Sequence, residues 1–298
     1  MRRILRQVAA VLASYSLIAA VASAQTSDWN AVDSIFGRKG ALQPGDVTRY
    51  SFPRTDLDVT AGGIKLKPAF ALGSWVALKR VPVGAMAMGD LVLTENEVGP
   101  VMTKLQEGGV EQTALHNHLL GETPHIMYLH VSGHGDPVKI ARAIHDALAA
   151  TKTPLTTPAT SSSPPADMDT AGIAMALGYH GKLNGAVYQV SVARRELVSE
   201  NGMEVPSSMG LATAINFQST GGGNAAITGD FVMTADEVNR VIRALQTNHI
   251  QPTRLHSHML NETPRLFFIH FWANAETISL ARGLSQALKQ MGVETPAR

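Results

Sequence analysis

The sequence of 298 residues contains no cysteine. It can therefore form no disulfide, and it cannot be a lipoprotein acylated on cysteine. Any metal site has to use histidine and carboxylate groups rather than thiolates. The sequence also lacks a G-x-S-x-G motif, a P-loop and a dinucleotide-binding glycine motif, so the common signatures of hydrolases and nucleotide-binding enzymes are missing.

Charge is sparse as well. Charged residues make up 16% of the chain, hydrophobic residues make up 45%, and the formal net charge is +1. This composition is typical of a globular protein and excludes a disordered or fibrous whole. The absence of a basic excess argues against nucleic acid as a partner.

The single long apolar run lies at the N-terminus. Three arginines fall within the first six residues, an Ala-rich run covers residues 8–21, and Ala22-Ser23-Ala24 provides a small-residue cleavage site. We therefore predict a signal peptide over residues 1–24 and a periplasmic or secreted protein without a stable membrane span after cleavage. An uncleaved anchor is the alternative, but the run is short for one. Cleavage removes three arginines and no acid, and the formal charge then falls from +1 to −2.

One fifteen-residue pattern, H-x-H-x3-E-T-P-x5-H, occurs at residues 116–130 and again at 256–270, exactly once in each half of the chain. The surrounding residues 89–148 align with 229–288 without a gap, and 22 of these 60 positions are identical. Internal similarity at a fixed offset, here 140 residues, is the signature of a duplicated unit.

The duplication defines the expected domains. Residues 25–150 form a first repeat, residues 151–170 a linker rich in Thr, Ser and Pro, and residues 171–298 a second repeat. Alternating apolar residues predict strands, and amphipathic stretches that follow capping boxes predict helices. The predicted fold class is α+β: a tandem duplication of two pseudo-symmetric domains, each a mostly antiparallel sheet with helices on one face.

Strand alternation places the histidines of the repeated pattern on one sheet face. His116 and His118 share a face of a predicted strand over residues 113–120, and His130 lies on the matching face of the next strand, 126–132. The other face of that second strand is purely apolar and should carry the helices. If residues 121–125 form a hairpin turn, His116 opposes His130 directly, and the three imidazoles converge.

Three neutral imidazoles and one open position are what a catalytic divalent metal requires, and zinc is the expected ion. Glu122 is a candidate fourth ligand or catalytic base, and Asp90 a candidate partner that orients a histidine. The second half repeats all of these candidates: metal ligands His256, His258 and His270, catalytic Glu262, and the orienting Asp230.

Two other interpretations of the histidines stay open at this stage. They could line a polar ligand pocket without metal, or form a purely structural hydrogen-bond network. The corresponding functions are a metal-dependent hydrolase, a non-enzymatic module for a small-molecule or cell-envelope ligand, and a structural protein. The sequence also leaves open whether the two histidine faces form separate sites or one shared site.

Similar histidine spacings occur in cupins and in lysostaphin-type peptidases. The cupin motif has a glycine seven residues after the glutamate, where this chain has Leu129. A helix is also predicted before the histidine strand, which the cupin fold would not have. The peptidases expect an upstream H-x3-D partner, which we do not find.

The runs "GDLVLTENEVGPVM" (89–102) and "TALHNHLLGETP" (113–124) resemble the LppY/LpqO family of exported bacterial proteins, a domain of unknown function. Residues 54–59 (RTDLDV) and 67–75 (KPAFALGSW) fit the same resemblance. The second half departs from the pattern at Arg254 and Ser257. The resemblance implies export and the two-domain arrangement, and it implies no activity.

Overall fold

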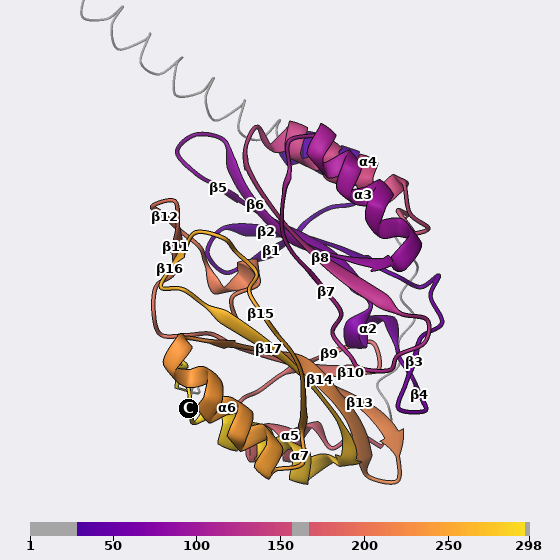
Figure 1. Ribbon diagram of the computed structural model, residues 1–298, viewed down its shortest axis with the longest axis vertical. Helices are drawn as coiled ribbons and strands as arrows, with labels where there is room; N and C mark the ends of the chain where they lie inside the picture. Colours follow the sequence, from indigo (N-terminus) through magenta and orange to yellow (C-terminus); the bar gives the residue numbers. More distant parts are fainter. Residues whose placement is uncertain (1–28, 157–166, 296–298) are drawn as a thin grey trace, which may run out of the picture.

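The computed structural model describes residues 29–156 and 167–295 (Figure 1). The predicted signal peptide lies outside the described residues, and so does the middle of the predicted linker. No helix within the described parts is long and apolar enough to cross a membrane.

Each half contains one six-stranded sheet in which every neighbouring pair of strands is antiparallel. The first sheet has the order β1 (Ala41–Gln43), β2 (Val47–Pro53), β5 (Gly73–Arg80), β6 (Ala85–Thr94), β8 (Ile126–Gly135), β7 (Glu111–His116). The second has the order β15 (Gln251–His256), β17 (Phe267–Glu276), β14 (Asn224–Met233), β13 (Thr213–Gly221), β10 (Val187–Val192), β9 (Lys182–Asn184). The two orders are equivalent when the first sheet is followed from β7, which ends at His116, and the second from β15, which ends at His256.

The remaining elements are helices and short strands. The first half has helical residues 29–36, then β3 (Thr60–Ala61), β4 (Ile64–Lys65), α2 (Pro68–Ala71), α3 (Glu95–Glu107) and α4 (Pro137–Ala149). The second half has α5 (Thr170–Leu177), β11 (Ser199–Glu200), β12 (Met203–Glu204), η1 (Ser207–Met209), α6 (Ala235–Thr247), β16 (Glu262–Thr263) and α7 (Thr277–Leu288).

The long helices begin where the sequence predicts. Thr94 and Glu97 form a capping box at the start of α3, and Thr234 and Glu237 form the same box at α6. In each box the threonine and glutamate side chains satisfy backbone N–H groups that have no partner within the helix.

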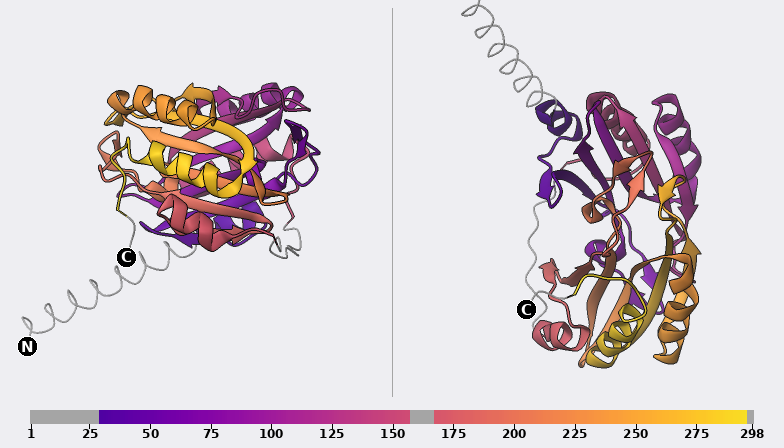
Figure 2. Two further views of the ribbon diagram at one scale, coloured as in Figure 1. Left: turned by 90° about the horizontal axis from the view of Figure 1, so that it is seen from below. Right: turned by 90° about the vertical axis from the view of Figure 1, so that its left-hand side faces the viewer.

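Helices cover the outer face of each sheet, and the inner faces meet (Figures 1 and 2). The apolar face of β8 packs with α3 and α4 in one core, and the second sheet packs with α5, α6 and α7 in another. The result is a helix–sheet–sheet–helix arrangement, and it confirms the predicted fold class. It also puts the histidine faces toward each other.

Two further apolar clusters join the halves, and they use equivalent residues in exchanged roles. In one cluster Val47 and Met86 of the first half pack with Val232 and Phe268 of the second. In the other, the equivalents Val187 and Ala226 of the second half pack with Val92 and Tyr128 of the first. This exchange is the pattern of an interface with two-fold symmetry, here within one chain.

A buried arginine locks each helix to its sheet. Arg54 is 0% exposed; its Nη1 donates to Val92 O at 2.6 Å and to Glu97 Oε2 at 2.8 Å. Arg194 makes the same two bonds, to Val232 O and Glu237 Oε2, both at 2.7 Å. Partnering of this kind is what makes a buried charge tolerable.

The predicted hairpin register is wrong by two residues. His116 pairs with Tyr128, and His130 pairs with Ala114. The strand leaves the ladder after His116 because residues 117–125 form a longer loop, whose Thr123 exchanges backbone hydrogen bonds with Thr60. A shift by two residues preserves the side-chain face. His116 and His130 therefore still lie on the inner face, as diagonal rather than direct neighbours.

Candidate metal site between the two domains

The six histidines of the repeated pattern form one cluster at the interface between the domains. The rings of His116 and His256, which are equivalent residues, lie 3.8 Å apart between centroids. His118 stacks on His270 at 3.7 Å, and the exchanged pair His130 and His258 stacks at 3.8 Å. The question that the sequence leaves open is thus answered: the two histidine faces meet.

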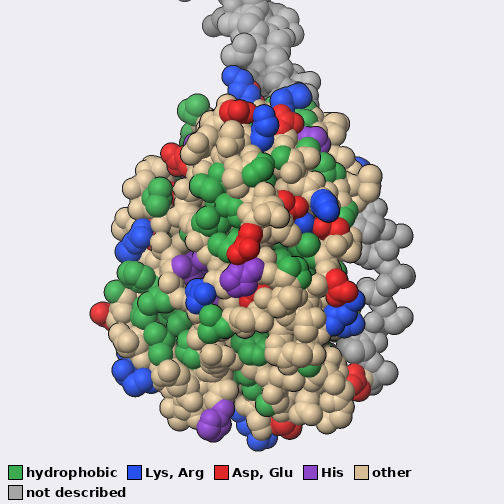
Figure 3. Space-filling model, turned by 45° about the vertical axis from the view of Figure 1, so that its right-hand side comes forward, with side chains coloured by type: hydrophobic (Ala, Val, Ile, Leu, Met, Phe, Trp, Pro, Cys, Tyr) green, Lys and Arg blue, Asp and Glu red, His purple; other side chains and the backbone are tan. Residues whose placement is uncertain are grey.

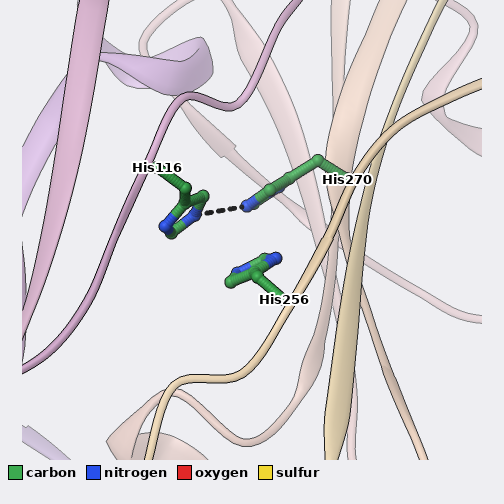
Figure 4. A group of neighbouring side chains, drawn as sticks. All are labelled: His116, His256 and His270. Carbon is green, nitrogen blue, oxygen red and sulfur yellow. Dashed lines mark hydrogen bonds between the residues drawn. The ribbon is translucent and has the colours of Figure 1, made fainter.

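Two overlapping groups of three histidines have ligand atoms close enough to hold one ion. The first is His116, His256 and His270, and the second is His130, His256 and His258; in each, the three ligand atoms lie within 4.8 Å of one another. Figure 4 shows the first group, with His116 on one side and the two histidines of the second half on the other. His256 belongs to both groups, and His118 to neither.

Hydrogen bonds define which nitrogens face the cluster. His270 Nδ1 lies 2.9 Å from the carbonyl oxygen of Gly229, which can only accept, so Nδ1 carries the proton. Its Nε2 then presents a lone pair toward His116 Nε2, 3.2 Å away. A backbone carbonyl that fixes the outer nitrogen is the usual support of a metal-binding histidine.

Four ring nitrogens in the cluster are buried without a hydrogen-bond partner among the described residues: His116 Nδ1, His118 Nε2, His130 Nε2 and His256 Nδ1. Such groups are rare in folded proteins, because burial removes their hydrogen bonds to water and nothing replaces them. His116, His130 and His256 belong to the two groups, so their donor set fits a bound ion. His118 belongs to neither group, and its Nε2 lies 3.8 Å from Asp90 Oδ2.

The cluster holds its histidines neutral. Burial lowers the pKa of His116 to about 2, of His256 to about 4 and of His258 to about 3. Burial, together with neighbouring histidines, also lowers the pKa values of His130 and His270 well below the usual range. Neutral imidazole is the form that binds metal.

Asp90 and Asp230 lie beside the cluster, opposite His130 and His270 in their sheets. Asp230 Oδ2 is 3.0 Å from His258 Nε2, whereas Asp90 Oδ2 is 3.8 Å from His118 Nε2. Burial raises the pKa of each carboxyl to about 7, and the charge of Asp230 adds to the rise for Asp90. Both candidate orienting residues are therefore close to a histidine.

Glu122 and Glu262, the candidate catalytic residues, are both buried; Glu122 lies in the loop after β7, and Glu262 begins the short strand β16. Among the described residues, neither belongs to a group of side chains that could share an ion. Glu262 accepts from Leu266 N at 3.0 Å and from Arg265 Nη1 at 3.1 Å. Burial raises the pKa of Glu122.

Several residues of the interface escape sequence reasoning. Thr113 Oγ1 donates to His258 O at 2.5 Å, and its equivalent Thr253 donates to His118 O at 2.6 Å. Arg254 donates through Nε to Asn117 Oδ1 across the interface. The identity of Thr113 and Thr253 between the repeats was a signal for the first pair, but nothing in the sequence reveals that they bond across the interface.

Solved structures and curated proteins give little guidance. A trimeric bacterial microcompartment shell protein, PduB, is 14% identical over 86% of this chain and 96% of its own, with a TM-score of 0.23. EtuB from Clostridium kluyveri is 13% identical over 87% and 96%, with a TM-score of 0.20. Likeness at this level carries no argument for fold or function. None of the curated proteins matches.

One protein family matches both halves of the chain. Its model covers residues 30–150 and again residues 171–290, so each match falls on one repeat with its own sheet and histidine triplet. The match does not carry the name LppY/LpqO, which stays a prediction. The chain belongs to the family described as Domain of Unknown Function (DUF1259).

Proposed function

We propose that this protein is an exported metalloprotein whose two domains together bind a divalent metal ion, with zinc the expected ion. The observation that carries the proposal is the sharing of His256 by two three-histidine groups that each draw on both halves of the chain. A set of neutral nitrogen ligands suits zinc and neighbouring transition metals better than magnesium or calcium, which prefer oxygen.

The enzyme class that this centre supports best is a metal-dependent hydrolase. His116 and His256 are partly exposed, while His270 is buried, so an open ligand position of the first group would lie on the side of His116 and His256. A divalent ion with three histidine ligands and an open position can activate water near neutral pH. The role of Asp230 as orienting residue and the role of Glu122 as base stay predictions.

A second candidate function is a non-enzymatic module for a small-molecule or cell-envelope ligand. Leu120 and Leu260, in the loops that follow the two edge strands, are exposed large apolar side chains. Figure 3 shows histidine side chains at the surface with hydrophobic side chains gathered on both sides of them. Exposed apolar surface beside polar groups is a common feature of binding sites.

Metal analysis of the protein without residues 1–24 tests the proposal. We expect wild type to retain zinc after dialysis and His256→Ala to retain almost none, because that change removes a ligand from both groups. His145→Ala, on the outer helix α4, is the matched control and should retain the wild-type amount. Wild-type protein that holds no stoichiometric metal and takes up none on zinc titration would contradict the proposal.

A further inference from the structure

Arg254 is a charged residue beside the histidines that has no charged counterpart in the first half. It opposes His270 in the second sheet and lies two residues before His256, on the same strand face. The equivalent position in the first half is Ala114, which opposes His130. The repeat therefore brings two sets of histidines to the interface but only one guanidinium at this position.

The guanidinium of Arg254 is held in place by the other domain. Nε donates to Asn117 Oδ1, and Nη1 donates to Thr253 O at 3.1 Å. Asn117 is buried, and its Nδ2 donates to Leu119 O at 2.7 Å, so its oxygen is turned toward the arginine. Nη2 of Arg254 has no hydrogen-bond partner among the described residues.

The charge of Arg254 is not balanced by a neighbouring acid. The described residues contain no carboxylate within ion-pair distance of its guanidinium, in contrast to Arg265, which pairs with Glu262 at 3.1 Å. The positive charge of Arg254 reaches the cluster, since it contributes to the lowered pKa of His116. A divalent ion among neutral histidines would add positive charge beside Arg254.

We propose that Arg254 is the anion-binding residue of this site and that the ligand carries an oxyanion, either phosphate or carboxylate, at the open side of the metal centre. This inference rests on the proposed function. A guanidinium fixed through Nε presents its remaining N–H groups as a planar fork, which matches the oxygens of either group. Because only one half supplies the arginine, the ligand binds in one orientation despite the pseudo-symmetry.

Cobalt(II) in place of zinc makes the proposal measurable, since its visible absorption changes when an anion joins its ligands. The probes are inorganic phosphate and acetate, titrated separately into cobalt-loaded protein; whichever binds more tightly identifies the oxyanion class. We expect Arg254→Gln to weaken binding of that anion by about 10–100-fold, as for loss of a charge-assisted hydrogen bond. Its cobalt content should stay at the wild-type level.

Arg265→Gln is the matched control, because that arginine lies on the same half and already has its own acid. It should bind the anion as wild type does. Thermal unfolding of Arg254→Gln separates a binding role from a structural one: a large fall in the unfolding midpoint with unchanged anion affinity would overturn the proposal. Failure of both anions to change the wild-type spectrum would overturn it too.

Failure of the metal proposal has a different signature, namely a wild-type protein that binds no cobalt. Calorimetric titration of the metal-free protein with phosphate and acetate then decides the role of Arg254. Anion binding that Arg254→Gln abolishes would support the residue without the metal. No heat of binding in wild type would end both proposals.

Discussion

The two halves of this protein share a framework and differ at the site. In both, a buried arginine joins a capping-box glutamate to the sheet, and an aspartate opposes a histidine in the central strands. The loops that follow the edge strands have diverged. Asn117 bonds across the interface to Arg254, whereas its equivalent Ser257 accepts from Arg265 within its own half.

The difference extends to the metal ligands. The first half supplies His116 and His130 to the two groups, and the second half supplies three histidines. His118 belongs to neither group, although its ring stacks on that of His270 at 3.7 Å between centroids. Duplication has thus preserved what each domain needs to fold, while the shared site has become asymmetric.

Substitution of the buried arginines that both halves share should have the largest effect on the free energy of unfolding. Arg54→Met and Arg194→Met each leave a buried glutamate without its partner, which costs about 3–5 kcal/mol of unfolding free energy. Urea unfolding should give similar losses for the two variants. Lys65→Met, at an exposed ion pair, is the control and should change little. A large loss in one half alone would break the equivalence of the two frameworks.

The ligand asymmetry predicts an order of zinc affinities. His256→Ala should lose more zinc affinity than His116→Ala, because His256 belongs to both groups. The loss for His256→Ala should exceed the roughly 100-fold effect of changing a residue that only supports a ligand. His118→Ala should lose least of the six histidine variants. Competition with a chromogenic chelator measures all of them. Equal losses for His118→Ala and its equivalent His258→Ala would show that the halves contribute symmetrically.

The histidine cluster should make the metal-free protein sensitive to acid. Because burial lowers the pKa of His256 to about 4 from 6.5, the unfolded chain binds protons there that the folded chain does not. Stability is therefore present above pH 6.5 and is lost as the pH falls toward 4. The other five histidines shift in the same direction.

The two aspartates affect the pH dependence of stability in the opposite direction to the histidines. Burial raises the pKa of Asp90 and Asp230 from 3.8 to about 7, so their contribution is lost as the pH rises through 7. Six histidines outweigh two aspartates, and urea midpoints of metal-free protein should rise from pH 5 to a maximum near 7. Asp230→Asn removes one opposing contribution and should therefore steepen the rise of the urea midpoint between pH 5 and 7. A midpoint independent of pH between 5 and 7 would contradict the neutral cluster.

Glu122 and Glu262 should have the smallest effect on the free energy of unfolding. Glu262→Gln loses an ion pair to a partly exposed arginine, which is worth up to about 1 kcal/mol. Glu122 has a raised pKa and no arginine at the equivalent position, which is His125, so Glu122→Gln should unfold at or above the wild-type urea concentration at pH 8. Zinc content should be unchanged in both variants. Zinc loss in Glu122→Gln would make this residue a ligand after all.

Local patterns predicted much of this molecule because they depend on neighbouring residues. The capping box at Thr94 required only the residues that follow it, and strand alternation placed His116 and His130 on the inner side. His118 lies in the loop beyond β7, where strand alternation does not apply. The register failed because it assumed the shortest turn, whereas Thr123 pairs with Thr60, more than sixty residues earlier in the chain. Local sequence patterns cannot predict a contact between residues so far apart in the chain.

The sequence by itself determined that the chain is duplicated, that each half is an α+β unit, and which side chains share a face. Only the tertiary structure decided that His116 lies on His256 and that His256 is common to both ligand groups. The physical reason is that side-chain faces follow from backbone geometry within a strand, whereas contacts between residues 140 apart depend on how two apolar surfaces dock. The repeated histidine pattern therefore became one site through packing between domains, which no single repeat encodes.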